Sequence, residues 1–246
     1  MNIVIPLAGR GTRVQLDYPK PLATVCGKPI IEWAVSSLGI NGNYIFITRH
    51  YDNEEYNRLL NDTLKRLQPD CKIISVNFTT DGPVCSALLA RQFINNDQSL
   101  IVTNCDQYTT WNAQNFLNFV NHDNVRGAIV TYDSNLSNKS YVLADERWVV
   151  TKTVEKDVIS NDAFTGIHYW RYGSDFVKSS EQMMMLNQRV NNEFYVAPSY
   201  NHMIANYKLY TDEYVYKYPI RNEQWWSLGT QEEIELFIKA KENGSI

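Results

Sequence analysis

Apolar residues along the first half of the chain follow two alternating patterns. Short runs that are apolar at nearly every position predict strands buried on both faces, and apolar residues three or four positions apart predict helices. The predicted strands are Ile3–Leu7, Tyr44–Thr48, Ile73–Phe78, Leu100–Thr103 and Ala128–Tyr132. The predicted helices are Pro29–Leu38, Glu54–Leu67 (capped by Asp52 or Asn53), Val84–Ile94 and Ala113–Val120. Strands that alternate with helices in this way indicate an α/β fold with right-handed crossovers.

The second half changes its pattern. Its predicted strands are Tyr141–Leu143, Trp148–Val154, Ile167–Trp170 and Glu213–Lys217, and its predicted helices are Ser174–Met185, Pro198–Tyr207 and Gln231–Glu242. The first three strands follow one another closely, which favours antiparallel pairing. We therefore expect a Rossmann-like, mixed, mainly parallel sheet flanked by helices, with a smaller antiparallel portion. No Pro/Gly/Ser-rich linker and no repeat divides the chain, so residues 1–246 are predicted to form one domain with halves 1–135 and 136–246.

The composition excludes several classes of protein. With 44% hydrophobic residues and mixed-sign charges that sum to −4, the chain is expected to bind neither nucleic acid nor a membrane surface. No apolar stretch approaches the roughly 20 residues of a spanning helix, and no basic-then-apolar leader opens the chain, so a soluble cytoplasmic protein is expected. The cysteines and histidines are scattered, which predicts reduced thiols and no zinc site.

One segment, LAGRGTRVQLDYPKPL (Leu7–Leu22), differs in charge from the rest of the chain. Four basic residues and one acid lie between positions 8 and 28, which gives a local charge of +3. Glycines after a first strand let backbone N–H groups approach an anion. The prolines of Pro19-Lys20-Pro21 hold the lysine backbone extended. Together these features predict a site for several phosphates, although a solvated surface turn would explain the glycines alone.

Two common nucleotide motifs fit this segment poorly. Gly9 and Gly11 match the first two glycines of G-x-G-x-x-G, but the third position is Val14. The acidic residue expected about twenty positions later would have to be Glu32, within a predicted helix. A Gly-Lys-Ser/Thr sequence is absent from the chain, so a P-loop is excluded.

Several short motifs resemble the signature of the sugar-phosphate nucleotidyltransferases, the nucleoside-diphosphate-sugar pyrophosphorylases. That pattern opens with G-G-x-G-T-R and P-K-P and closes with W-x-D-x-G-T. The matching segments here are Leu7–Arg13, Pro19–Leu22, Thr80-Asp81-Gly82, Asn104-Cys105-Asp106, Tyr141-Val142, Val154-Glu155-Lys156, Thr165–Tyr169 and Trp226–Thr230. The resemblance covers nearly the whole chain and implies that 1–135 binds a nucleotide and 136–246 an acceptor.

The resemblance implies attack by an acceptor phosphate oxygen on the α-phosphorus of an NTP, which releases pyrophosphate. Such reactions depend on positioning and on neutralising charge. Arg13 would stabilise the phosphates and the leaving pyrophosphate, and Lys20 would hold the α-phosphate. Asp106 would bind Mg²⁺, and Lys156 would hold the acceptor phosphate. The implied substrate-binding residues are Leu7, Ala8, Gly9, Gly11, Thr12, Asn77, Gly82, Glu155 and Gly166.

This sequence departs from the pattern at three places. Ala8 stands for its first glycine, and Val142 stands for the glycine of Y-G. Ser227 stands where the pattern has a second metal carboxylate, and a serine hydroxyl is a poorer Mg²⁺ ligand. Either Asp106 and the phosphates hold the ion without it, or another carboxylate such as Glu223 takes its place.

The resemblance leaves the substrates open. Asn77 lies where relatives carry a base-pairing glutamine, and its amide suits U, T or C. The leading hypothesis is transfer of a pyrimidine nucleotide to a sugar 1-phosphate for surface polysaccharide synthesis. Alternatives are a CTP-dependent enzyme for a non-sugar phosphate such as phosphocholine, and a catalytically silent regulatory protein. The expected partners are an NTP and a phosphorylated small molecule, with a homo-oligomer as an open alternative.

Overall fold

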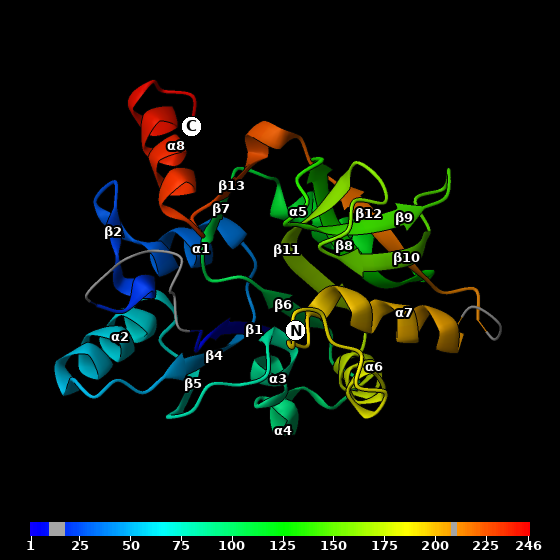
Figure 1. Cartoon of the computed structure of the whole chain (residues 1–246), viewed down its shortest axis with the longest axis horizontal. Helices are drawn as coiled ribbons and strands as arrows, with labels where there is room; N and C mark the ends of the chain where they lie inside the picture. The colour runs from blue at the N-terminus through cyan, green and yellow to red at the C-terminus, as the bar shows by residue number, and fades with distance from the viewer. Residues whose placement is uncertain (10–17, 208–210) are drawn as a thin grey trace.

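A nine-stranded mixed sheet forms the centre of the structure, a computed structural model that describes residues 1–9, 18–207 and 211–246 (Figure 1). Its strands are β1 (Asn2–Leu7), β4 (Asn43–Arg49), β5 (Lys72–Val76), β6 (Leu100–Thr103), β8 (Val125–Asp133), β9 (Ser140–Ala144), β10 (Val150–Glu155), β11 (Asp162–Trp170) and β12 (Tyr214–Pro219). Seven of them lie in the order β10-β9-β11-β6-β1-β4-β5, while β8 pairs with both β11 and β12.

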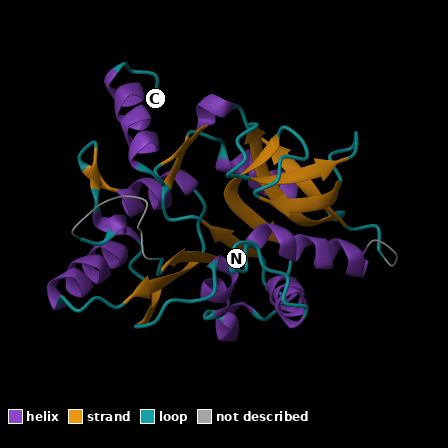
Figure 2. Cartoon of the chain, in the orientation of Figure 1, coloured by secondary structure: helices purple, strands orange, loops and turns teal. Residues whose placement is uncertain are grey.

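Helices cover the sheet, and two small ribbons lie beside it (Figure 2). The helices are α1 (Ile30–Leu38), α2 (Glu54–Leu67), α3 (Pro83–Leu88), α4 (Arg91–Ile94), α5 (Ala113–Val120), α6 (Gly173–Met185), α7 (Val196–Tyr207) and α8 (Gln231–Glu242), with 3-10 turns η1 (Lys20–Leu22) and η2 (Asn222–Gln224). The ribbons are β2 (Thr24–Val25) with β3 (Lys28–Pro29), and β7 (Gln107–Thr109) with β13 (Trp225–Ser227). None of the helices in the described residues is both long and apolar enough to cross a membrane.

The predicted fold class is confirmed. Strands β1, β4, β5 and β6 are parallel to their neighbours within this group, as the unbroken apolar runs require. Strand β11 pairs antiparallel with β6, β8 and β9, and β9 pairs antiparallel with β10. The parallel strands therefore have their carboxyl ends at one edge, together with the amino end of β11.

Alternate residues of β1 enter two separate cores. Val4 packs in a cluster with residues of α3, α6 and α7, whereas Ile3 and Ile5 pack in a cluster with residues of α1, α2 and α5. All three side chains are fully buried. A strand covered on both faces needs apolar residues at successive positions, which is why the pattern of this segment is continuous.

Two predicted helices differ from those in the structure. The helix predicted over 84–94 is two short helices, because the amides of Leu89 and Ala90 bond to carbonyls three residues back and tighten the chain at the end of α3. Pro29 precedes α1 in an extended conformation instead of forming its first turn. Of the two predicted caps of α2, Asn53 is the one used: its Oδ1 accepts the N–H of Glu55 at 2.9 Å.

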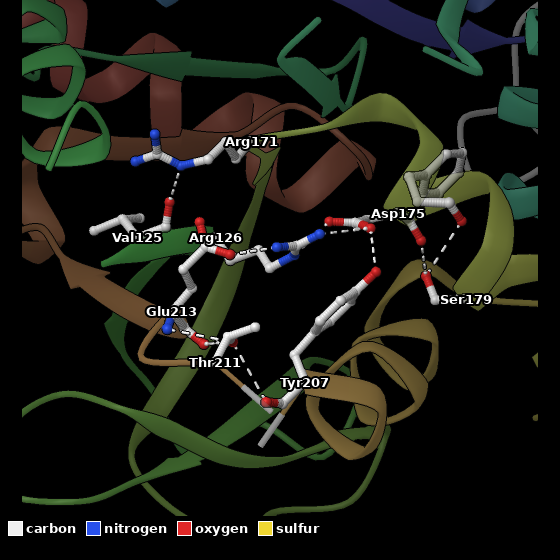
Figure 3. A network of polar contacts seen from close by, with 9 residues as sticks. Val125, Arg126, Arg171, Asp175, Ser179, Tyr207, Thr211 and Glu213 are labelled. Atoms are coloured by element: carbon white, nitrogen blue, oxygen red, sulfur yellow. Dashed lines mark hydrogen bonds and ion pairs between the residues drawn. The ribbon is translucent and has the colours of Figure 1, made fainter. Parts of the chain in front are cut away.

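A network of charged and aromatic side chains connects β8 to α6, α7 and the residue just before β12 (Figure 3). Arg126 Nε donates to Asp175 Oδ2 at 2.7 Å, and its Nη1 donates to Glu213. The guanidinium lies 3.7 Å from the ring centroid of Tyr207, whose hydroxyl donates to Asp175 Oδ1 at 2.6 Å. Burial lowers the pKa of Arg126, but hydrogen bonds and charge from the two carboxylates outweigh burial and raise it above its ordinary value.

His168 is a buried histidine in the centre of β11, between aromatic rings. Its ring stacks at 6.0 Å from Tyr200 and 6.1 Å from Trp170, and within the described residues its Nδ1 has no hydrogen-bond partner. Burial lowers the pKa of His168 to about 3. The side chain therefore stays neutral inside the fold at pH values where an unfolded chain would be protonated.

We expect His168→Phe to reduce the loss of stability in acid. Between pH 6.5 and about 3 the unfolded chain binds a proton that the folded one does not, so stability falls as pH falls, by about 1.4 kcal/mol per unit. Urea unfolding at pH 7 and pH 5 should show that the wild type loses about 2 kcal/mol more than His168→Phe. An equal loss in both proteins would contradict this assignment.

Candidate active site

Lys20 and Asp106 form an ion pair at the edge where the parallel strands have their carboxyl ends. Lys20 Nζ lies 2.6 Å from Asp106 Oδ2 and donates to the carbonyl oxygen of Gly229 at 3.1 Å. Lys20 begins η1 between two prolines, and Asp106 follows β6. The two side chains are only 11% and 17% exposed, so the pair is largely shielded from solvent. The structure thus brings together two of the four predicted catalytic residues.

The chain after β13 holds this pair from the other side. The backbone of Ser227 pairs with Gln107, and the N–H of Leu228 donates to the carbonyl of Asp106 at 2.7 Å. Three oxygens surround Gly229, where a side chain would begin: a Cβ there would lie 3.0 Å from Glu233 Oε2, 3.2 Å from Ser227 Oγ and 3.5 Å from Asp106 Oδ2. Glycine leaves this space between the oxygens open.

Glu233 is a site residue that the sequence analysis missed. Its Oε2 accepts the hydroxyl of Ser227 at 2.6 Å and the N–H of Gly229 at 3.1 Å, and its Oε1 lies 2.9 Å from Lys139 Nζ. Burial raises the pKa of the Glu233 carboxyl, but these hydrogen bonds and the lysine charge outweigh burial and leave it below the ordinary value. Its position three residues after Thr230 is a sequence signal for a helix cap, which could have drawn attention to it.

Glu223 does not lie beside Ser227, which corrects the expectation that it could replace the missing carboxylate. It sits in η2 with a 62% exposed side chain and pairs with Arg221 Nε at 2.9 Å. The carboxylate that contacts Ser227 is Glu233, which the first turn of α8 directs back toward Gly229.

Two predicted glycines allow close packing of backbone. Gly166 has φ +97°, and a Cβ there would lie 2.2 Å from the side-chain Nδ2 of Asn104. The backbone N–H of Asn104 donates to the carbonyl oxygen of Gly166 at 3.2 Å. Gly82 has φ +121°, and a Cβ there would lie 2.6 Å from the backbone nitrogen of Phe194. The first glycine seats Asn104 next to Asp106, and the second lets residues before α7 close over the start of α3.

Glu155 and Lys156 follow one another at the end of β10, and their contacts are with residues other than those around Lys20 and Asp106. Lys156 has φ +57°, and its Nζ donates to the hydroxyl of Tyr195 at 2.6 Å. Glu155 accepts a hydrogen bond from Ser140, and burial raises the pKa of its carboxyl. No described contact joins either residue to Lys20 or Asp106.

The remaining predicted residues lie at the same sheet edge or outside the described residues. Leu7 and Ala8 are buried in the two cores, so only their backbone can face a ligand, while Gly9 is exposed. Asn77 is exposed directly after β5, the last strand of the sheet. Gly11, Thr12 and Arg13 lie outside the described residues.

Within the described residues, the cysteine and acidic side chains do not form a metal site by themselves. All four cysteines are thiols and none forms a disulfide. Across residues 1–9, 18–207 and 211–246, no three His, Cys, Asp or Glu side chains gather as they would around a metal ion.

The fold is shared with nucleoside-diphosphate-sugar pyrophosphorylases of known structure, and the first part of the chain matches a cytidylyltransferase family model. Residues 1–103 match the family model of IspD, the 2-C-methyl-D-erythritol 4-phosphate cytidylyltransferases. The crystal structure of the nucleoside-diphosphate-sugar pyrophosphorylase from Vibrio cholerae RC9 superposes with a TM-score of 0.79 at 19% identity, covering 96% of this chain and 99% of that one. UDP-glucose pyrophosphorylase complexed with UDP-glucose superposes with a TM-score of 0.76 at 15% identity, covering 99% and 98%.

One curated protein is similar to part of the chain. The bifunctional protein GlmU of Pseudothermotoga lettingae is 23% identical over 164 residues, which cover 65% of this chain. The match spans only 35% of that relative's length. The resemblance to nucleotidyltransferases that the sequence motifs predict is confirmed by the family model and by the solved structures that share this fold.

Proposed function

We propose that this protein transfers a nucleoside monophosphate from an NTP to a phosphorylated small molecule and releases pyrophosphate. The observation that carries the proposal is the shielded Lys20–Asp106 pair, with Lys20 Nζ 2.6 Å from the carboxylate at the carboxyl edge of the sheet. We further propose a single cytoplasmic domain in which residues 1–135 bind the nucleotide and 136–246 the acceptor. A pyrimidine base and a sugar 1-phosphate acceptor, for surface polysaccharide synthesis, are the leading choices.

In this proposal, charge and position accelerate the reaction. The ammonium of Lys20 binds Asp106 and the carbonyl oxygen of Gly229 in the nucleotide-free protein. When the NTP binds, this ammonium would bind the α-phosphate instead. Arg13 neutralises the departing pyrophosphate, and Lys156 holds the acceptor phosphate. The acceptor needs no general base, because a phosphate monoester is already an anion near neutral pH.

The proposed nucleotide pocket surrounds these charges. The backbone of Leu7, Ala8 and Gly9, continued by Gly11 and Thr12, would present N–H groups to the phosphates. Asn77 and Gly82 would border the base. Glu155 and Gly166 would border the acceptor. Leu7, Ala8, Gly9, Gly11 and Thr12 belong to the end of β1 and the segment that follows it, and Asn77 and Gly82 follow β5, whose carboxyl end lies at the same edge of the sheet.

The residues around Gly229 fit a divalent cation, for which we propose Mg²⁺. Oxygens of Asp106, Ser227 and Glu233 converge within 3.5 Å of one point, and Mg²⁺ prefers oxygen ligands, several of them from water and phosphate. Asp106 would hold the ion. When bound, it would supply positive charge for the triphosphate.

A second candidate function is a cytidylyltransferase that acts on a non-sugar phosphate such as phosphocholine. The match of residues 1–103 to the 2-C-methyl-D-erythritol 4-phosphate cytidylyltransferases favours CTP and an alcohol phosphate. The amide of Asn77 suits cytosine as well as uracil or thymine, so the choice of base depends on measurement.

Pyrophosphate release, measured with each NTP against a panel of sugar 1-phosphates and alcohol phosphates, tests the proposal. Release that requires both substrates is the expected result, and the most active pair gives the base and the acceptor class. Release with CTP and an alcohol phosphate alone would select the second candidate. If no pair gives release while a nucleotide or nucleotide sugar still binds, the protein is a catalytically silent regulator and the proposal is wrong.

A further inference from the structure

Two carboxylates, each bound by a lysine, converge on Gly229. Asp106 Oδ2 lies 2.6 Å from Lys20 Nζ, and Glu233 Oε1 lies 2.9 Å from Lys139 Nζ. The other oxygen of Glu233 and the oxygen of Asp106 that binds Lys20 both face the open point beside Gly229, at 3.0 and 3.5 Å. The oxygens come from the loop after β6 and from the first turn of α8, so the fold alone brings them together.

The charges of this group balance only while Lys20 stays on Asp106. Two ammonium groups then compensate two carboxylates, and the side chains are 11% to 24% exposed, so their interaction is weakly screened. If Lys20 moves to a phosphate, Asp106 and Glu233 are left with one ammonium between them. Partly buried carboxylates without a compensating charge are costly, and a divalent cation between their oxygens would compensate them and leave one positive charge in excess toward the phosphates.

We infer that Glu233 is the second carboxylate of the cation site, opposite Asp106, and that Lys20 occupies Asp106 until the nucleotide withdraws it. The inference rests on the proposed function for the identity of the ligand that withdraws Lys20. Ser227 acts through Glu233: its hydroxyl donates to Oε2 at 2.6 Å and fixes the carboxylate toward Gly229. Cation binding is thus coupled to nucleotide binding by a single lysine.

Mn²⁺ binding to the nucleotide-free protein tests this directly, because Mn²⁺ takes the same oxygen ligands and its free form gives an EPR signal. Lys20→Met removes the ammonium from Asp106 and should raise Mn²⁺ affinity at least about tenfold over the wild type. Adding Glu233→Gln to the Lys20→Met protein should lower its Mn²⁺ affinity about 10- to 100-fold. Adding Glu232→Gln, an exposed neighbour in the same turn of α8, should leave it unchanged.

A rescue variant separates ligation from a general disturbance of α8. Ser227→Asp, placed in the Lys20→Met/Glu233→Gln protein, puts a carboxylate beside the position of Glu233 Oε2 and should restore Mn²⁺ affinity. Circular dichroism of each variant checks that it is folded. Mn²⁺ affinity that is the same with and without Glu233→Gln in folded Lys20→Met protein would overturn the inference.

The outcome is independent of the test of the proposed function. If pyrophosphate is released but Mn²⁺ affinity does not depend on Glu233, the inference is wrong and the proposed function stands. If Mn²⁺ binding depends on Glu233 but no substrate pair gives pyrophosphate, the cation site stands and the proposed reaction is wrong.

Discussion

Replacing Lys20 by alanine is expected to lower turnover about 10²- to 10³-fold, the effect typical of losing one charge donor aimed at the reacting group. The reason is that the ammonium that would stabilise the α-phosphate, and that lies 2.6 Å from Asp106 in the nucleotide-free protein, is gone. Pyrophosphate release with the most active substrate pair, analysed for kcat and KM separately, measures the effect. A fall mainly in kcat indicates a contact made in the transition state.

Lys28→Ala is the matched control for Lys20→Ala. Lys28 belongs to the same basic segment, but its side chain is 47% exposed and its Nζ lies 3.8 Å from Glu32. Glu32 keeps its 2.7 Å ion pair with Arg66 when the exposed lysine is removed, so turnover should stay within about threefold of the wild type. Turnover of Lys20→Ala within a few-fold of the wild type, in a protein folded by circular dichroism, would show that the phosphate site lies elsewhere.

Arg126→Met is expected to destabilise the fold by about 3–5 kcal/mol, because it breaks a largely buried charge network by removing the guanidinium that binds both of its carboxylates. Among the described residues, Asp175, whose side chain is only 6% exposed, and Glu213 would be left without the cation that they both bind (Figure 3). The ring of Tyr207 would also lose the guanidinium that lies 3.7 Å away. For a chain of this size, the melting temperature should fall by about 6–20 °C in a thermal denaturation measurement.

An exposed ion pair elsewhere in the chain is the control for Arg126→Met. Arg147 lies 3.3 Å from Asp145, and its side chain is 76% exposed. Arg147→Met should therefore cost less than about 1 kcal/mol. Neutralising the partners in an Arg126→Met/Asp175→Asn/Glu213→Gln protein should recover part of the lost stability, since the uncompensated charges are gone. A loss of under about 1 kcal/mol for Arg126→Met itself would contradict a structural role of this network.

Local signals explain which elements the sequence predicts well. The bounds predicted for α2, α5 and α8 agree with the structure, and each helix begins after a capping side chain, from Asn53, Asn112 and Thr230 respectively. A cap and a 3.6-residue apolar pattern are both contained in the segment itself. Strands β7 and β13 have three residues each, too few for a periodic pattern, and they exist because they pair with each other.

The sequence by itself determined the α/β class. It also indicated the segment with glycines and a lysine after the first strand, and Asp106 after the strand that ends at Thr103. Their meeting depends on tertiary structure, because Lys20 and Asp106 are 86 positions apart and Lys20 and Gly229 are 209 apart. Only the fold decided that Glu233, not Glu223, lies beside Ser227. The 3-10 turn leaves Glu223 exposed beside Arg221, whereas the N-terminal turn of α8 directs Glu233 to the free N–H of Gly229, a geometry that no spacing in the sequence reveals.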